Sequence, residues 1–329
     1  MTAAVSNRTL TAVSGLTVGH AADSEAATGC TAILGPFSGA VDVRGLASGS
    51  RELDVLSPLH VVEQCDGLLL TGGSAFGLSA ADGVVRWLEE RGRGFRTSVA
   101  TVPIVPCAVI FDLGHGSAER RPGPEMGYAA ASSAGTSPVR EGDHGVGTGA
   151  TVGKLLGMEH SERGGVGCWA ETYEDGVVAA LAVVNAFGDV LDDSGRILAG
   201  CRGGSGRFLD TAEALRQGGV HGSFGSLRPA ENTTLGVVAL EAPVARLGLQ
   251  VVARQAMNAV ARRISPANTP FDGDMVFALS TGTAPAGVEG KRMSQAEILT
   301  LALRAEAVLA KAIVRAVPAG RAEPSDGTD

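Results

Sequence analysis

Short apolar runs bounded by glycine and polar residues stand out in the first quarter of the chain. They cover residues 15–20, 29–34, 40–44 and 67–70. Runs of this length between turn-forming residues are typical of β-strands. The N-terminal part of the chain is therefore expected to contribute several strands.

Helical spacing of apolar residues follows in three places. From residue 74 to residue 90, apolar residues recur every three or four positions, which predicts a helix with Ser74 as its N-cap. Helices are also predicted over residues 243–264 and 294–317. The second of these begins with Ser294-Gln295-Ala296-Glu297, which has the form of a capping box.

Further apolar runs lie between and before these helices. They predict buried strands over residues 104–113, 177–184, 234–240 and 275–280, and a hairpin over residues 188–198. The chain has no internal repeat. It is therefore expected to mix strands and helices along most of its length.

Three segments lack a clear period. Residues 114–148 are rich in Gly, Pro and Ser, which favours a long loop or lid with a short helix near Tyr128. Residues 202–231 are rich in Gly and Arg and are expected to be a mobile segment. The tail, residues 318–329, is expected to be disordered.

Composition limits the class of protein and its partners. The 329 residues are 44% hydrophobic and 19% charged, which is enough for a sizeable core in one large domain or two smaller ones. The net charge of −8, with no basic patch, argues against nucleic acid or an anionic membrane as a partner. We see no run long enough to cross a bilayer and no secretory signal, so a cytoplasmic location is expected.

Cysteine and histidine give no metal pattern. The five cysteines include no Cys-x-x-Cys pair and are expected to be buried, reduced thiols. The six histidines lack metal-ligand spacing, so neither a metal nor an organic cofactor is expected. A cysteine nucleophile or a Ser-His-Asp triad remains an alternative, although no Gly-x-Ser-x-Gly motif supports a triad.

The most informative motif is Asn232-Thr233-Thr234, which runs directly into the apolar residues 235–240. If the Asn232–Thr233 bond breaks, Thr233 gains a free α-amine beside its own hydroxyl. An α-amine has a reference pKa of about 7.7–8.0, so it can accept the hydroxyl proton near neutral pH. The alternative, a simple turn leading into a strand, stays open on this tripeptide alone.

Four other residues have the chemistry to assist such a nucleophile. Lys154 is one of only three lysines, and a buried lysine can lower its pKa as an arginine cannot. Asn185 ends an apolar strand, where its amide is suited to an oxyanion hole. Asp272 and Asp274 flank a glycine before a strand and either form a turn or orient the nucleophile.

Taken together, these motifs resemble the L-aminopeptidase/D-esterase family, which includes β-peptidyl aminopeptidases and nylon-oligomer hydrolases. The resemblance extends from about residue 16 to residue 317 and rests on an ordered set of motifs. They are residues 71–78, 103–106, 109–113, 149–154, 184–185, 232–234 and 271–274.

The resemblance implies a fold and an activity. It implies an α+β fold, a layered αββα sandwich of N-terminal-nucleophile-hydrolase type, in a single catalytic domain over residues 1–329. The chain is expected to cut itself into an α chain, 1–232, and a β chain, 233–329, that stay associated in a homotetramer. It then acts as an amidohydrolase or aminopeptidase on a small amide, peptide or oligoamide.

The resemblance also implies site residues. Thr233 is the expected nucleophile, with Lys154, Asn185, Asp272 and Asp274 as the residues that assist it. The Asn232–Thr233 junction is more similar to the nylon-oligomer hydrolases than to family members with a serine nucleophile.

One departure concerns substrate binding. The nylon-oligomer hydrolases carry a tyrosine where this chain has Phe111, and Tyr128 is the nearest tyrosine in sequence that would replace the missing hydroxyl. Two alternative functions remain: an acyltransferase of the ornithine acetyltransferase type, which also processes itself at a threonine, and a non-enzymatic small-molecule-binding protein.

Overall fold

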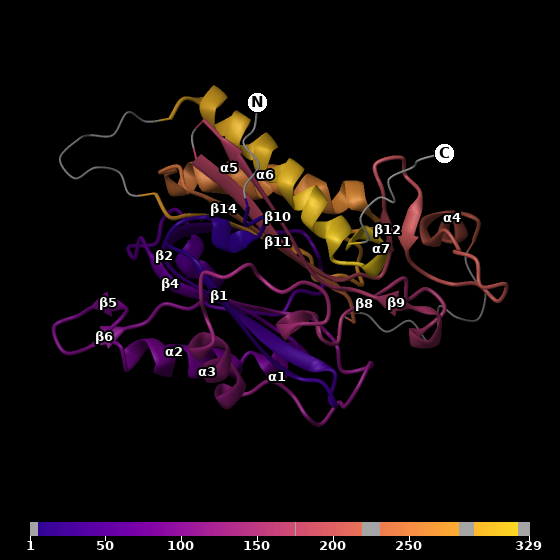
Figure 1. The fold of residues 1–329 in the computed structure, drawn as a ribbon, viewed down its shortest axis with the longest axis horizontal. Helices are drawn as coiled ribbons and strands as arrows, with labels where there is room; N and C mark the ends of the chain where they lie inside the picture. Colours follow the sequence, from indigo (N-terminus) through magenta and orange to yellow (C-terminus); the bar gives the residue numbers. More distant parts are fainter. Residues whose placement is uncertain (1–5, 175, 219–230, 283–292, 322–329) are drawn as a thin grey trace.

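Two β-sheets lie face to face between two pairs of helices, which gives four layers (Figure 1). The structure is a computed structural model that describes residues 6–174, 176–218, 231–282 and 293–321. The layered αββα sandwich expected from the resemblance is confirmed, and with it the α+β class.

The first sheet carries the strand that begins at Thr233. Its order is β10 (Gly165–Tyr173), β11 (Gly176–Asn185), β14 (Thr233–Leu240), β16 (Met275–Ser280) and the second half of β2 (Thr28–Val43). Only the β14–β16 pair is parallel among these. β14 therefore has a hydrogen-bonded neighbour on each side.

The second sheet is continuous with the first through β2. The first half of β2 pairs with β1 (Thr17–Asp23) and β4 (Cys65–Thr71), and β4 is followed by β7 (Cys107–Val109) and β3 (Ser50–Arg51). The two strands predicted over residues 29–34 and 40–44 are thus a single strand, β2. Its first half pairs in the second sheet and its second half pairs in the first sheet.

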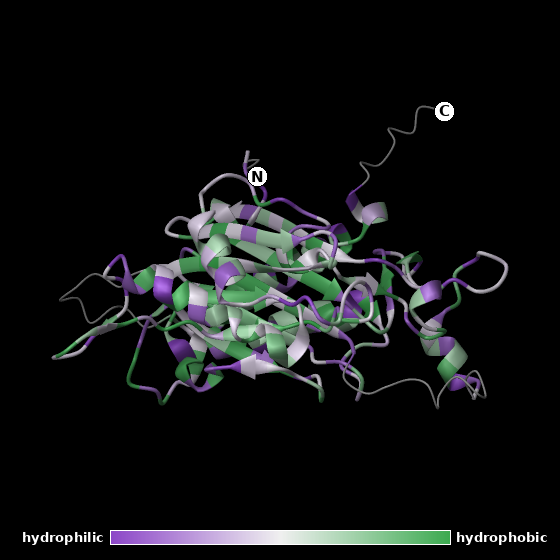
Figure 2. Cartoon of the chain, turned by 90° about the horizontal axis from the view of Figure 1, so that it is seen from below, coloured by the Kyte–Doolittle hydropathy of each residue, from purple (hydrophilic) through white to green (hydrophobic). Residues whose placement is uncertain are grey.

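Helices cover both outer faces. α5 (Arg246–Arg263) and α6 (Gln295–Arg315) cover the first sheet, and α2 (Ala80–Glu89) and α3 (Pro124–Ser132) cover the second (Figure 1). Successive side chains of β14 point to opposite faces of the sheet and pack into two different hydrophobic cores. Leu235 and Val237 point between the sheets, whereas Val238 points toward α5 and α6. Figure 2 shows the resulting apolar interior with polar residues toward the loops.

Smaller elements complete the described fold. The minor helices are η1 (Leu10–Ala12), η2 (Leu53–Leu56), α1 (Ser74–Gly77), η3 (Gly145–Gly147), η4 (Met158–His160), α4 (Thr211–Arg216) and α7 (Pro318–Arg321). The minor strands are β5 (Phe95–Arg96), β6 (Thr101–Val102), β8 (Thr151–Val152), β9 (Glu162–Arg163), β12 (Asp189–Leu191), β13 (Ile197–Ala199) and β15 (Ile264–Ser265). No helix among the described residues is long and apolar enough to cross a membrane.

Several local predictions are confirmed and one is wrong. The capping box at Ser294 is present, and so are the hairpin of β12 and β13 and the short helix near Tyr128. Ser74 is not an N-cap: its side chain makes no capping bond, and its main chain is left-handed, with φ of 53°. The predicted helix is therefore two, α1 and α2.

The segments expected to lack structure are partly ordered. Within residues 202–231, α4 is capped by the side chain of Asp210, while residues 219–230 lie outside the described residues. Within the tail, α7 occupies four residues that were expected to be disordered, and residues 322–329 lie outside the described residues.

Candidate active site

Thr233 and Asn185 face each other at the end of two neighbouring strands. Thr233 begins β14, Asn185 ends β11, and the two residues are paired in the antiparallel register. Both follow the alternation that points side chains between the sheets. Only 5% of Thr233 and 0% of Asn185 are exposed, so the predicted nucleophile lies in a largely dry site.

The carbonyl of Asn232 receives two hydrogen bonds. The Thr233 hydroxyl donates to it at 2.5 Å, and the main-chain N–H of Gly273 donates at 2.9 Å. The carbonyl that Thr233 would attack is thus already polarised by a main-chain donor, as in an oxyanion hole. Sequence reasoning missed Gly273, although a glycine between two aspartates was a signal of close packing.

Lys154 lies in the loop after β8, and its ammonium group is held beside Asn185. Nζ donates to Oδ1 of Asn185 at 2.8 Å, to the main-chain oxygen of Asn185 at 3.1 Å and to that of Glu231 at 3.4 Å. Burial lowers the pKa of Lys154 to about 7, against the attraction of Asp272, Glu231 and Asp112. A substantial fraction of this lysine is therefore uncharged near neutral pH.

Asn185 positions the lysine. Besides Lys154, its Oδ1 accepts from the main-chain N–H of Thr151 at 3.1 Å, and its Nδ2 donates to the main-chain oxygen of Phe111 at 2.8 Å. The amide is thus directed at Lys154, Thr151 and Phe111. Its predicted role as an oxyanion donor stays a prediction.

Asp272 and Asp274 are buried and hold the main chain around Thr233. Asp274 accepts from the N–H of Thr234 at 2.6 Å and of Asn268 at 2.9 Å. Asp272 accepts from the N–H and the hydroxyl of Thr269, at 2.9 and 2.5 Å. Burial raises the pKa of both carboxyl groups, and the Asp272 charge raises that of Asp274 further.

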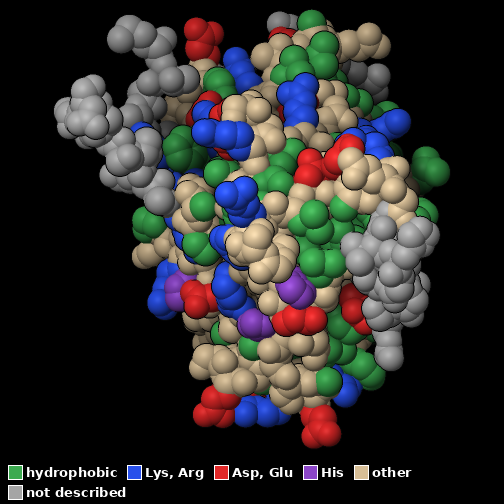
Figure 3. Space-filling view, turned by 90° about the vertical axis from the view of Figure 1, so that its right-hand side faces the viewer, with side chains coloured by type: hydrophobic (Ala, Val, Ile, Leu, Met, Phe, Trp, Pro, Cys, Tyr) green, Lys and Arg blue, Asp and Glu red, His purple; other side chains and the backbone are tan. Residues whose placement is uncertain are grey.

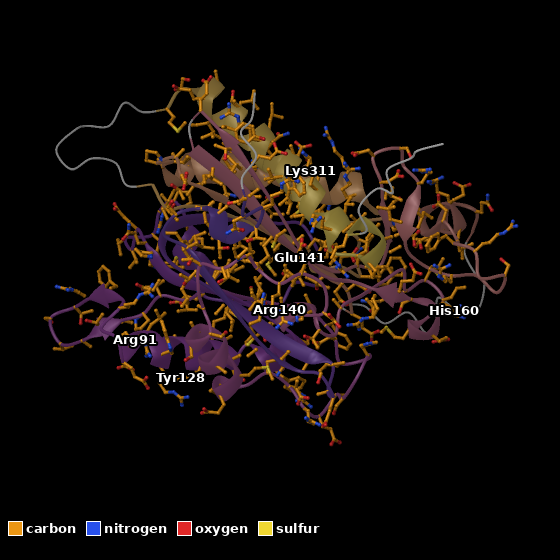
Figure 4. All side chains as sticks on the ribbon, viewed as in Figure 1. Arg91, Tyr128, Arg140, Glu141, His160 and Lys311 are labelled. Carbon is orange, nitrogen blue, oxygen red and sulfur yellow. The ribbon has the colours of Figure 1, made fainter. Side chains whose placement is uncertain are left out.

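Of the two aromatic residues expected to bind substrate, only one lies at the site. Phe111 lies at the site, where its main-chain oxygen accepts from Asn185. Tyr128 does not: its hydroxyl donates to Glu90 at 2.7 Å, and its ring stacks under Arg86. Figure 4 shows Tyr128 well away from His160, which ends η4, the short helix that follows Lys154 in sequence. The helical face of α3 packs Tyr128 against α2, so sequence proximity to Phe111 was misleading.

Asp112 is a further buried acid that sequence reasoning did not single out. It accepts from the hydroxyl of Thr28 at 2.6 Å and from the N–H of Gly73 at 2.7 Å. Burial raises its pKa. Asp112 therefore ties the left-handed turn at Gly73 to the loop that carries Phe111.

Cysteine and metal chemistry find no support in the described residues. All five cysteines are buried, and burial raises the pKa of Cys30 and Cys65 to about 12. Within the same described ranges, no group of three or more His, Cys, Asp or Glu residues is placed to hold a metal ion.

Similar solved structures have the same fold at low sequence identity. A β-aminopeptidase from Burkholderia sp. has a TM-score of 0.71 at 20% identity, with 97% of this chain and 88% of that chain covered. The L-aminopeptidase D-Ala-esterase/amidase from Ochrobactrum anthropi, described as a variant of the Ntn-hydrolase fold, has a TM-score of 0.70 at 19% identity, covering 94% of this chain and 85% of its own.

Relatives of known sequence are closer. An uncharacterised aminopeptidase of Mycobacterium tuberculosis is 41% identical over 340 aligned positions, covering 97% of this chain and 95% of the relative. The 6-aminohexanoate-oligomer endohydrolase of Kocuria sp. is 30% identical over 292 positions, covering 84% of this chain and 77% of the relative. The sequence model of peptidase family S58 matches residues 8–328. The chain therefore belongs to peptidase family S58, and it is a hydrolase of amide or peptide bonds.

Proposed function

We propose that the chain cuts its own Asn232–Thr233 bond and then hydrolyses small linear amides with Thr233 as an N-terminal nucleophile. The observation that carries this proposal is the shared contact on the Asn232 carbonyl. Its oxygen accepts from the Thr233 hydroxyl at 2.5 Å and from the Gly273 N–H at 2.9 Å. Nucleophile and oxyanion donor thus meet at the bond to be broken.

The first step is an acyl shift. Thr233 Oγ forms a bond to the Asn232 carbonyl carbon, the C–N bond breaks, and the leaving nitrogen takes a proton to become the Thr233 amine. Water then hydrolyses the ester and leaves a carboxylate on Asn232. In the uncut chain the Thr233 nitrogen is an amide, so another base must accept the hydroxyl proton. Lys154, with a pKa of about 7 and contacts to Glu231, is the best-suited group.

Departure of Asn232 after the cut is favoured by its surroundings. Among the described residues, Asn232 Oδ1 is buried without a hydrogen-bond partner. An unsatisfied buried acceptor costs about 1–3 kcal/mol, and water would satisfy it once the new chain end moves away. The vacated position beside Gly273 is where a substrate carbonyl would bind.

In the second step the α-amine of Thr233 accepts the proton of its own hydroxyl as Oγ attacks the substrate amide. The Gly273 N–H stabilises the oxyanion, and the leaving amine departs to give an acyl-enzyme that water hydrolyses. When charged, Lys154 lowers the pKa of the nearby amine by repulsion, which keeps the amine available as a base. The chemistry requires no metal or organic cofactor.

The proposed substrates are linear peptides or oligoamides. The names of the relatives support both aminopeptidase and 6-aminohexanoate-oligomer activity. We propose a cytoplasmic enzyme that binds neither nucleic acid nor membranes, with associated α and β chains. The pairing of β14 with β11, and of β16 with β2, joins the two chains and supports that association. The resemblance supports a homotetramer.

A substrate panel tests the activity. Processed wild type should hydrolyse at least one class of substrate among peptides, β-amino acid amides, D-amino acid esters and 6-aminohexanoate oligomers, and Thr233→Ala should hydrolyse none. Acetyl transfer from acetylornithine to glutamate, faster than any hydrolysis, would instead support the acyltransferase.

A further inference from the structure

Arg163 lies one strand away from the site described above. It belongs to β9, where it pairs directly with Thr151 of β8. The main-chain N–H of Thr151 donates to Oδ1 of Asn185, the same atom that holds Lys154. Paired residues of an antiparallel ladder point to the same face, so the Arg163 side chain extends on the side of Thr151.

The guanidinium of Arg163 has no acidic partner in the described part of the chain. Nη1 lies 2.5 Å from Nε2 of His115, and Nη2 donates to the main-chain oxygen of Thr148 at 2.6 Å. Because a guanidinium only donates, His115 accepts through Nε2 and is neutral. These contacts leave other N–H groups of the guanidinium for a further acceptor. By contrast, the neighbouring Glu162 is paired with Arg202.

His115 connects Arg163 to the loop that carries Phe111 and Asp112. Its main-chain N–H donates to the oxygen of Asp112, next to Phe111, whose own oxygen accepts from Asn185. Burial lowers the pKa of His115, and the charges of Arg163 and Lys154 lower it further. His115, which contacts Arg163, is therefore within electrostatic reach of Lys154.

Apolar atoms flank the pair. The sulfur of Met158 accepts from the Thr151 hydroxyl at 3.9 Å, and a Cβ added to Gly114, next to His115, would lie 3.8 Å from Met158 Cγ. Figure 3 faces the end of the molecule that carries β8 and β9, where basic side chains and histidines gather on the surface. A cation beside an aliphatic side chain matches a substrate with a methylene chain and an anionic end.

We propose that Arg163, oriented by His115 and Thr148, binds a carboxylate of the substrate and selects for linear amides that carry one. This inference rests on the proposed amide hydrolysis at Thr233. Arginine is suited to the role because its planar fork matches the two oxygens of a carboxylate. Two sources supply that group: the C-terminus of the leaving amine, or an acid on the acyl part.

The test compares matched substrates on processed enzyme. The first pair is a peptide that the enzyme hydrolyses, or the 6-aminohexanoate dimer, supplied as the free acid and as the C-terminal amide. The second pair is glutaryl-p-nitroanilide and its side-chain amide, which moves the carboxylate to the acyl part. The proposal expects wild type to prefer the acid in one of the pairs, with a preference that falls as salt is added. The pair that shows the preference identifies the source.

Variants assign the effect to Arg163. Arg163→Gln should lower kcat/KM for the preferred acid by about 10- to 100-fold and leave its amide within about 3-fold. Arg163→Lys should retain part of the preference. Arg196→Gln is the control, since it removes one charge from an 83% exposed side chain paired with Asp192. Self-cleavage and thermal unfolding verify the fold of each variant.

The outcomes separate the two proposals. Wild type that hydrolyses acid and amide equally in both pairs overturns the carboxylate site and leaves the amidase intact. That result needs no variant, so it holds even if Arg163→Gln does not fold. An Arg163→Gln enzyme that keeps the full preference also overturns the carboxylate site. Processed wild type that cleaves no amide overturns the proposed function, and the carboxylate site with it.

Discussion

A Cβ added to Gly273 would lie 3.0 Å from the hydroxyl oxygen of Thr233. The same added atom would lie 2.9 Å from the main-chain oxygen of Ala47. A side chain at residue 273 therefore does not fit between the Thr233 hydroxyl and the main chain of Ala47 and Ser48. The absence of a side chain at residue 273 brings its N–H onto the Asn232 carbonyl.

Replacing this glycine should impair the cut. Gly273→Ala pushes the N–H away from the Asn232 carbonyl, and losing one oxyanion donor typically costs 10²–10³ in rate. We expect self-cleavage to slow by about 100-fold, measured on denaturing gels during refolding. Gly204→Ala is the matched control, since a Cβ there meets nothing within 4 Å. Unchanged cleavage in Gly273→Ala would remove its N–H from the mechanism.

The group that accepts the Thr233 hydroxyl proton during self-cleavage should determine how the rate of self-cleavage depends on pH. Because burial lowers the pKa of Lys154 to about 7, the uncharged form increases as pH rises through 7. The rate of self-cleavage should rise with it and level off above pH 8. Lys154→Arg keeps a permanent charge, so it should cut at least about 100-fold more slowly.

Lys311→Arg is the control for that substitution, because Lys311 is half-exposed and paired with Glu171. It should keep the wild-type profile. A Lys154→Arg protein that cuts at the wild-type rate with the same pH midpoint would show that another group accepts the proton.

Asp189 should couple pH to the stability of the segment before the cut. It accepts from the N–H groups of Cys201 and Thr211, at 2.9 and 2.8 Å. Burial raises its pKa from 3.8 to about 6. The folded state therefore binds more protons between these values. The contribution of Asp189 to the free energy of unfolding is therefore full below about pH 4 and is lost as pH rises through about 6.

The measurement compares wild type with Asp189→Asn by chemical unfolding. The free energy of unfolding of wild type, relative to the variant, should fall by about 1–3 kcal/mol between pH 4 and pH 7. A difference that grows with pH over this range would contradict the raised pKa.

Phe111 should limit activity on nylon-type oligomers. The nylon-oligomer hydrolases that this chain resembles carry a tyrosine at this position, so Phe111→Tyr supplies the missing hydroxyl. We expect kcat/KM on 6-aminohexanoate oligomers to rise by about 10-fold, the value of one good hydrogen bond. Tyr128→Phe should change nothing, since that hydroxyl is bonded to Glu90. Equal activity of Phe111→Tyr and wild type would exclude this role.

Local signals in the sequence predicted much of the fold. The capping box at Ser294 and the alternation after Thr233 depend on neighbouring residues, and both are present. β10 was missed because its sequence, Gly165–Tyr173, mixes glycine and polar residues among its apolar ones. The left-handed turn at Ser74 was missed because a distant carboxylate, Asp112, holds it.

At the candidate site, too, local motifs predicted which residues take part, whereas their contacts depend on distant parts of the chain. The motifs identified Lys154, Asn185, Asp272 and Asp274, and the structure brings all four around Thr233. Which atom contacts which depends on long-range pairing. A glycine between two aspartates indicated close packing at residue 273, but the contact of its N–H with the Asn232 carbonyl depends on the fold. The distance of Tyr128 from the site follows from the packing of α3 on α2.

The central claim concerns one bond, and intact-mass spectrometry with N-terminal sequencing tests it most directly. Purified active wild type should contain two polypeptides, the second beginning at Thr233, and Thr233→Ala should remain one chain of 33.2 kDa. Thr233→Ser should still cut, because it keeps the hydroxyl. Active wild type found as a single uncut chain, or a Thr233→Ala protein split at the same bond, would contradict the account.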